Sequence, residues 1–101
     1  MAYDRALAAL QGYTRRRVIN ALRMRPRSVV EIHRTLSTPR LLKRPAVSRP
    51  AISQALTVLL RARLVKRRVE GRRHIYQLDR TGFDELRDYL DGLERLPGFD
   101  S

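Results

Sequence analysis

Cysteine is absent from the 101 residues of this chain. This absence excludes disulfide bonds, thiolate-bound zinc and thiol redox chemistry, and it suits a protein of the reducing cytoplasm. Long apolar runs are absent too, because no stretch approaches the ~18 apolar residues that a membrane-spanning helix needs. The residues that follow Met1 lack the basic, apolar and small-residue order of a signal peptide. We therefore expect a cytoplasmic protein that does not enter the membrane.

Recognisable catalytic patterns are missing as well. The chain has no glycine-rich phosphate loop and no histidine placed with serine and aspartate for nucleophilic catalysis. Its two histidines, His33 and His74, fall in a predicted helix and a predicted strand, so a shared metal site is not expected. Only 6% of the residues are aromatic, which argues against a platform for stacking bases. The sequence predicts no enzyme, no cofactor and no metal site.

Acidic residues are few and unevenly placed. Lysine and arginine number 22 against 10 aspartates and glutamates, which gives a formal net charge of +12. Residues 1–78 hold 19 of the basic and 3 of the acidic residues, whereas residues 79–101 hold 3 and 7. A general arginine-rich bias would not spare the end of the chain, so the excess indicates a polyanionic partner. Nucleic acid is the leading candidate, because cationic side chains displace counterions from phosphates.

Apolar periodicity predicts three short helices in the first third of the chain, over residues 4–11, 15–24 and 29–36. Thr14 is the expected cap of the second helix. Ser28 and Glu31 have the S-x-x-E spacing of a capping box, in which each side chain accepts a hydrogen bond from the backbone N–H of the other. The third helix is therefore expected to begin directly after Ser28.

A polar helix follows a long connection. Residues 37–48 contain two prolines and no apolar period, which predicts an extended loop. Ser48 then caps a helix over residues 49–61, in which Pro50 occupies a first-turn position that needs no N–H. Four apolar residues of this helix follow its period and are expected to face the core: Ile52, Leu56, Leu59 and Leu60. The opposite side is polar and free of acidic residues.

The period changes to that of strands after this helix. Residues 64–69 and 74–78 are rich in strand-forming residues, and Gly71 lies in the short connection between them, which predicts a hairpin. The side chains expected to point inward are Val65, Val69, Ile75 and Leu78. Helical spacing returns over residues 80–96. We therefore predict a single domain, residues 1–101, that is mainly α-helical with a two-stranded β-hairpin, in the winged helix-turn-helix order α-α-α-α-β-β-α.

A polar helix followed directly by an arginine-rich hairpin suits the reading of double-stranded DNA. Such a helix enters the major groove, where glutamine pairs with adenine and arginine with guanine. We assign base contacts to Arg49, Ser53, Gln54 and Thr57. Phosphate contacts are assigned to Arg61, Lys66, Arg67, Arg68, Arg72 and Arg73.

Residues 51–65 and 68–78, with a Glu-Gly-Arg hairpin tip and a following tyrosine, resemble the recognition helix and wing of ArsR/SmtB-type repressors. The similarity covers about residues 15–79. It implies a homodimer bound to an inverted-repeat operator, with residues 1–12 and 80–96 as dimerisation helices. The interface residues expected on this basis are Leu7, Leu10, Phe83, Leu86, Leu90 and Leu93.

Three features depart from that family. Ala55 stands where relatives have a histidine in the recognition helix. The connection after Leu36 is about ten residues longer than the ~3–4-residue turn of a tight helix-turn-helix. Residues 37–48 could contact DNA or be disordered, and we favour disorder. The cysteine and histidine ligands with which many relatives sense metals are missing, and the acidic stripe of the last predicted helix is expected only to be solvated.

Three hypotheses remain open at this level. The first is a dimeric, sequence-specific repressor or activator whose recognition helix is residues 49–61, and the resemblance favours a repressor. In the second, the DNA-binding module is retained but a separate protein senses the signal and docks on the last helix or the long loop, because the familiar ligand residues are absent. The third is an RNA-binding or architectural basic protein without sequence preference.

Overall fold

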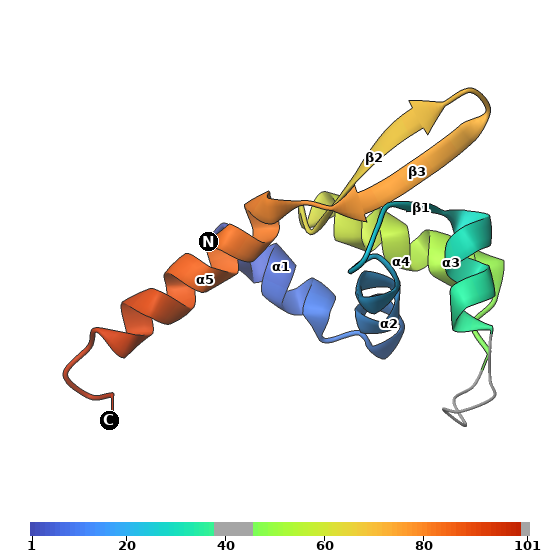
Figure 1. The fold of residues 1–101 in the computed structure, drawn as a ribbon. Coiled ribbons are helices and arrows are strands. Elements are labelled where there is room, and N and C mark those ends of the chain that lie inside the picture. Colours follow the sequence, from blue (N-terminus) through green and yellow to red (C-terminus); the bar gives the residue numbers. More distant parts are fainter. Residues whose placement is uncertain (38–45, 100–101) are drawn as a thin grey trace.

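The computed structural model describes residues 1–37 and 46–99. Within these residues the chain forms five helices and three strands (Figure 1). Their order is α1 (Tyr3–Leu10), α2 (Tyr13–Ala21), β1 (Arg27–Ser28), α3 (Val29–Leu36), α4 (Arg49–Arg61), β2 (Val65–Glu70), β3 (Arg73–Leu78) and α5 (Arg80–Glu94). The predicted order is confirmed, with one additional strand. Most of the predicted 37–48 loop lies outside the described residues.

The additional strand, β1, corrects the prediction of a two-stranded hairpin. β1 pairs antiparallel with β3, with Arg27 opposite Tyr76 and Ser28 opposite Ile75, and the strand order is β1-β3-β2. A strand of two residues carries no periodicity, which is why the sequence did not reveal it. Its pairing joins the hairpin β2–β3 directly to the start of α3.

The ends of α2 also differ from the prediction. Gly12, not Thr14, is the N-cap residue of α2, and the helix ends at Ala21, before the expected end near Met24. The Arg15 side chain occupies the space beside Gly12, where any Cβ atom would collide with its guanidinium group. Arg15 Nε also donates to the carbonyl oxygen of Ala9 at 2.7 Å. An arginine of α2 thus caps the C-terminal end of α1.

The predicted starts of α3 and α4 are confirmed. Ser28 and Glu31 form the complete capping box of α3, with both reciprocal hydrogen bonds present. The Ser48 hydroxyl accepts from the Ala51 N–H at 3.2 Å at the start of α4. Both helix starts were predictable because the capping partners lie within three residues of each other.

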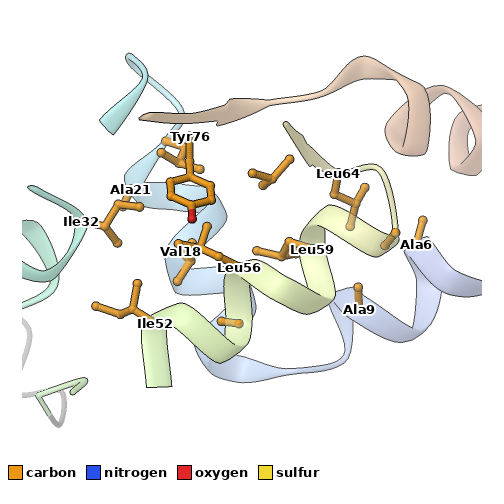
Figure 2. Close-up of a cluster of buried hydrophobic side chains, with 14 of the residues drawn as sticks. Ala6, Ala9, Val18, Ala21, Ile32, Ile52, Leu56, Leu59, Leu64 and Tyr76 are labelled. Atoms are coloured by element: carbon orange, nitrogen blue, oxygen red, sulfur yellow. The ribbon is translucent and has the colours of Figure 1, made fainter. Parts of the chain in front are cut away.

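Figure 2 shows the core between α2, α3, α4 and the sheet. The aromatic ring of Tyr76 points from β3 toward Val18 of α2. The largest fully buried side chains are Val18, Ile32, Ile52, Leu56, Leu59, Leu64 and Val65. The core therefore fixes α4 by one side and leaves its other side exposed.

The outer half of the hairpin lies outside this core. Val65 and Ile75 are buried and Leu78 is partly buried, as expected. Val69, which was predicted to point inward, is instead 63% exposed. β2 and β3 extend beyond the helices (Figure 1), and Val69 lies outside the core that the described residues form. The alternation of side chains therefore predicted burial correctly only for the part of the hairpin that lies over the core.

α5 begins in close contact with the end of α4. Asp79 caps α5 by accepting from the Thr81 N–H at 3.0 Å, and the Gly82 N–H donates to the Arg63 carbonyl oxygen at 2.7 Å. α5 then packs along α1, where the rings of Tyr3 and Tyr89 stack with centroids 4.0 Å apart.

Candidate nucleic-acid interface

The exposed side of α4 carries the residues to which base contacts were assigned. Ile52, Ala55, Leu56 and Leu59 are buried against the core, and the opposite side turns Arg49, Ser53, Gln54, Thr57 and Arg61 to solvent. This exposed side has no acidic residue. The Thr57 hydroxyl donates to the Ser53 carbonyl oxygen at 3.1 Å, which leaves its methyl group and its oxygen lone pairs for a ligand.

The hairpin β2–β3 forms an exposed basic wing beside α4. Gly71 at its tip has φ +60° and open space around its Cα atom, and this left-handed conformation is the one that glycine adopts without strain. All five basic residues assigned to phosphate contacts in the wing are exposed: Lys66, Arg67, Arg68, Arg72 and Arg73.

The wing cations differ in their partners within the chain. Arg68 lies 3.6 Å from the Glu70 carboxylate and 3.1 Å from the Gln77 side-chain oxygen. Arg73 lies 2.7 Å from the Glu31 carboxylate of α3. Within the described part of the chain, Lys66, Arg67 and Arg72 have no carboxylate within 4.0 Å. These three side chains are therefore the wing cations most available to a polyanion.

Hollows lie on both sides of the exposed residues of α4. A groove of 740 Å³ separates it from the wing and the start of α3, and Ser53, Arg72 and His74 are among its lining residues. A smaller hollow of 280 Å³ lies on the α2 side, where Gln54 and Val58 line it. The adjacent residues Ser53 and Gln54 therefore line different hollows beside α4.

No protein-family profile matches the chain. The HTH-type transcriptional regulator Rv2034 of Mycobacterium tuberculosis is 47% identical over 88 residues, which cover 87% of this chain and 74% of that protein. The crystal structure of a possible transcriptional regulator for arsenical resistance is 33% identical and superposes with a TM-score of 0.69, covering 87% of this chain and 82% of the other. The chain belongs to the ArsR family of winged helix-turn-helix transcriptional regulators.

A more distant ArsR-family structure shares the fold. The homodimeric winged helix-turn-helix domain Mb0332 of Mycobacterium bovis, a possible ArsR-family regulator, is 21% identical with a TM-score of 0.66, covering 98% of this chain and 88% of that domain. The prediction of a regulator, and of no enzyme, is confirmed, because the relatives are transcriptional regulators.

Ala55 and the two histidines can now be placed in this ArsR-family chain. Ala55 is buried against the core, so the alanine in place of the familiar histidine does not reach the exposed side of α4. His74 lines the groove between α4 and the wing, whereas the Nε2 atom of His33 lies 3.4 Å from the Ser37 hydroxyl at the end of α3. No group of three or more His, Asp or Glu side chains suited to a metal ion occurs in residues 1–37 and 46–99.

The residues predicted for a dimer interface fall on α1 and α5, which pack against each other. Leu7 and Leu90 are exposed, at 44% and 55%, and Leu10, Phe83 and Leu93 are partly buried. Leu86 is only 8% exposed, since it packs within its own chain.

Of the described helices, none is long and apolar enough to cross a bilayer.

Several arginines have structural roles that the charge count did not reveal. Arg16 donates to the Leu10 carbonyl oxygen at 2.7 Å, and Arg27 donates to the Ala21 carbonyl oxygen at 2.7 Å. Arg17 is buried, lies over the Tyr13 ring and donates to the Leu36 carbonyl oxygen. Part of the positive charge therefore holds helix ends in place. Arginine alone gives no sequence signal that separates this role from phosphate binding.

Proposed function

We propose that this ArsR-family chain is a homodimeric, sequence-specific repressor that acts in the cytoplasm on an inverted-repeat operator. The exposed, acid-free side of α4 beside an exposed basic wing carries this proposal. α4 enters the major groove, and each wing follows the flanking backbone. The base contacts come from Arg49, Ser53, Gln54 and Thr57. The phosphate contacts come from Arg61, Lys66, Arg67, Arg68 and Arg72.

Gln54→Ala is expected to relax sequence preference at one base pair of each half-site. A bidentate pair between glutamine and adenine contributes about 1–3 kcal/mol of discrimination against the wrong base. Titration of labelled duplexes that carry single-base changes, in an operator selected from random sequences, measures this discrimination. Val58→Ala is the matched control, because Val58 lies on α4 outside the proposed base contacts. An equal loss of affinity for every duplex would contradict the role of Gln54.

Leu90→Asp is expected to dissociate the proposed dimer. Leu7 and Leu90 are exposed on packed helices of one chain, and a related domain from Mycobacterium bovis is described as homodimeric. Burial of a leucine side chain contributes about 1.5–3 kcal/mol to the free energy of association. A twofold interface buries the same leucine of both protomers, so this contribution is made twice. The dissociation constant should therefore rise on the order of 100-fold or more, as measured by sedimentation equilibrium. Asp88→Asn, on the other side of α5, should leave it unchanged, and an unaltered Leu90→Asp dimer would rule out this interface.

A second candidate function keeps the DNA-binding module and delegates sensing to a separate protein. It is supported by the lack of cysteine in the whole chain and of a metal-binding cluster in the described part. In this case a partner protein releases the regulator from its operator. Release of the purified protein by a metal ion or a metabolite alone would contradict it.

A further inference from the structure

Arg73, at the start of β3, joins the wing to the start of α3. Its Nη2 atom lies 2.7 Å from Glu31 Oε1 and 3.3 Å from Ser28 Oγ. These contacts bridge 42 and 45 positions of sequence. These side-chain hydrogen bonds join the wing to the start of α3.

Glu31 is held in position before it meets Arg73. Its Oε1 atom accepts from the Ser28 N–H at 3.0 Å, and its own N–H donates to the Ser28 hydroxyl at 3.3 Å. The hydrogen bond from the Ser28 backbone is the main reason that the pKa of Glu31 lies below its ordinary value, and the hydroxyl, Arg73 and Arg25 act in the same direction. The carboxylate is thus a fixed, charged acceptor for the wing.

The backbone places Arg73 on the correct face of the sheet for this contact. Ser28 lies opposite Ile75 in the β1–β3 register, and Arg73 is two residues before Ile75, so its side chain projects on the same face. Arg72 immediately precedes Arg73 and has no carboxylate partner in the described residues. Two adjacent arginines of the wing therefore have different surroundings.

We propose that Glu31 and Ser28 hold Arg73 as a latch that orients the wing relative to the helix-turn-helix. Arg73 is then a positioning residue and not a phosphate ligand, which revises its assignment from the sequence. Arg73 is the residue of β3 nearest the hairpin tip and lies opposite Glu70, in the outer part of the wing, where Val69 is exposed and lies outside the core. A latch near the tip of the wing reduces the conformational entropy that ordering the wing on DNA would cost. This inference rests on the proposed function for its effect on DNA binding.

The first experiment needs no DNA. Glutamine at position 31 can still complete the capping box but lacks the charge that attracts Arg73. Amide hydrogen exchange is measured in E31Q, R73Q and the double variant. Each single change should accelerate exchange of the amides of residues 73–78 about twofold to fivefold, the range of an ion pair of modest strength. The double variant should exchange no faster than either single one.

The matched control for exchange is R72Q, which removes the neighbouring arginine and should leave these amides unchanged, because no described carboxylate pairs with Arg72. Exchange across α3 reports whether the capping box survives in E31Q. Additive effects of E31Q and R73Q, or no acceleration in R73Q, would overturn the latch. This outcome is independent of whether the protein binds DNA.

The second experiment compares the two adjacent arginines on DNA. R72Q should flatten the dependence of log affinity on log salt concentration by about 0.9 for each phosphate that is no longer neutralised. R73Q should weaken binding about twofold to fivefold at every salt concentration and leave the slope unchanged, the effect of an ion pair of modest strength. A slope reduced equally in both variants would show that Arg73 binds phosphate and would refute its positioning role. Failure of the wild-type chain to bind any duplex would instead count against the proposed function.

Discussion

Gly82→Ala is expected to lower the free energy of unfolding by about 3 kcal/mol, at the upper end of the cost of overpacking a tight site. A Cβ atom at position 82 would lie 2.5 Å from the Ala62 carbonyl oxygen and 2.7 Å from the Arg63 carbonyl oxygen. Both neighbours are backbone atoms, so no side-chain rotation can make room. The turn itself has little freedom, because the Leu64 N–H donates back to the Leu59 carbonyl oxygen at 3.0 Å and Arg63 has φ +57°.

Gly92→Ala provides the matched control for this change. Gly92 lies in the same helix, and a Cβ atom there would meet nothing within 4 Å. Alanine at position 92 should stabilise the protein by roughly 0.5–1 kcal/mol, because glycine inside a helix loses more backbone entropy on folding. Thermal and urea unfolding measure both variants. Equal stability of the two would mean that α5 does not approach the end of α4 as closely as the structure shows.

Raising the salt concentration from about 50 to 200 mM is expected to weaken operator binding by on the order of 10³-fold. The wing has three cations without carboxylate partners in the described residues, Lys66, Arg67 and Arg72, and a homodimer presents them twice. The six phosphate contacts of these cations alone release enough counterions for a loss of about this size, and contacts from Arg61 and Arg68 add to it. Fluorescence anisotropy of a labelled operator across this range gives the slope.

The origin of this slope is tested by exchanging the three wing cations together for glutamine. The triple variant should lose most of the salt dependence, because the released counterions belong to the contacted phosphates. Arg95→Gln removes one positive charge at the end of α5, away from the wing, and should leave the slope unchanged. A triple variant with the wild-type slope would place the phosphate contacts elsewhere on the chain.

The helix starts illustrate what could be predicted from neighbouring residues. Ser28 with Glu31, and Ser48 with Pro50, correctly predicted the beginnings of α3 and α4. Their signals are local, since a cap satisfies backbone N–H groups within its own first turn. The exposed polar side of α4 followed from the same logic, because the apolar period identifies the buried side.

The wrong predictions also share a physical cause, because each feature depends on how separate elements of the fold lie relative to one another. β1 exists because β3 is available to pair with it, and two residues carry no pattern of their own. Val69 is exposed because the helices end before the wing does. The N-cap residue of α2 is Gly12 and not Thr14. The Arg15 side chain lies beside Gly12 and caps the C-terminal end of α1.

The sequence by itself determined the order of helices and strands, the acid-free side of α4 and the excess of basic residues before residue 79. These properties depend on residue type and on spacing within one or two helical turns. Only the tertiary structure decided how that charge is used, since it directs Arg15, Arg16 and Arg27 to backbone carbonyl oxygens and Arg73 to Glu31. A charge is visible in the sequence, but its partner is selected by distances that arise only when distant segments pack together.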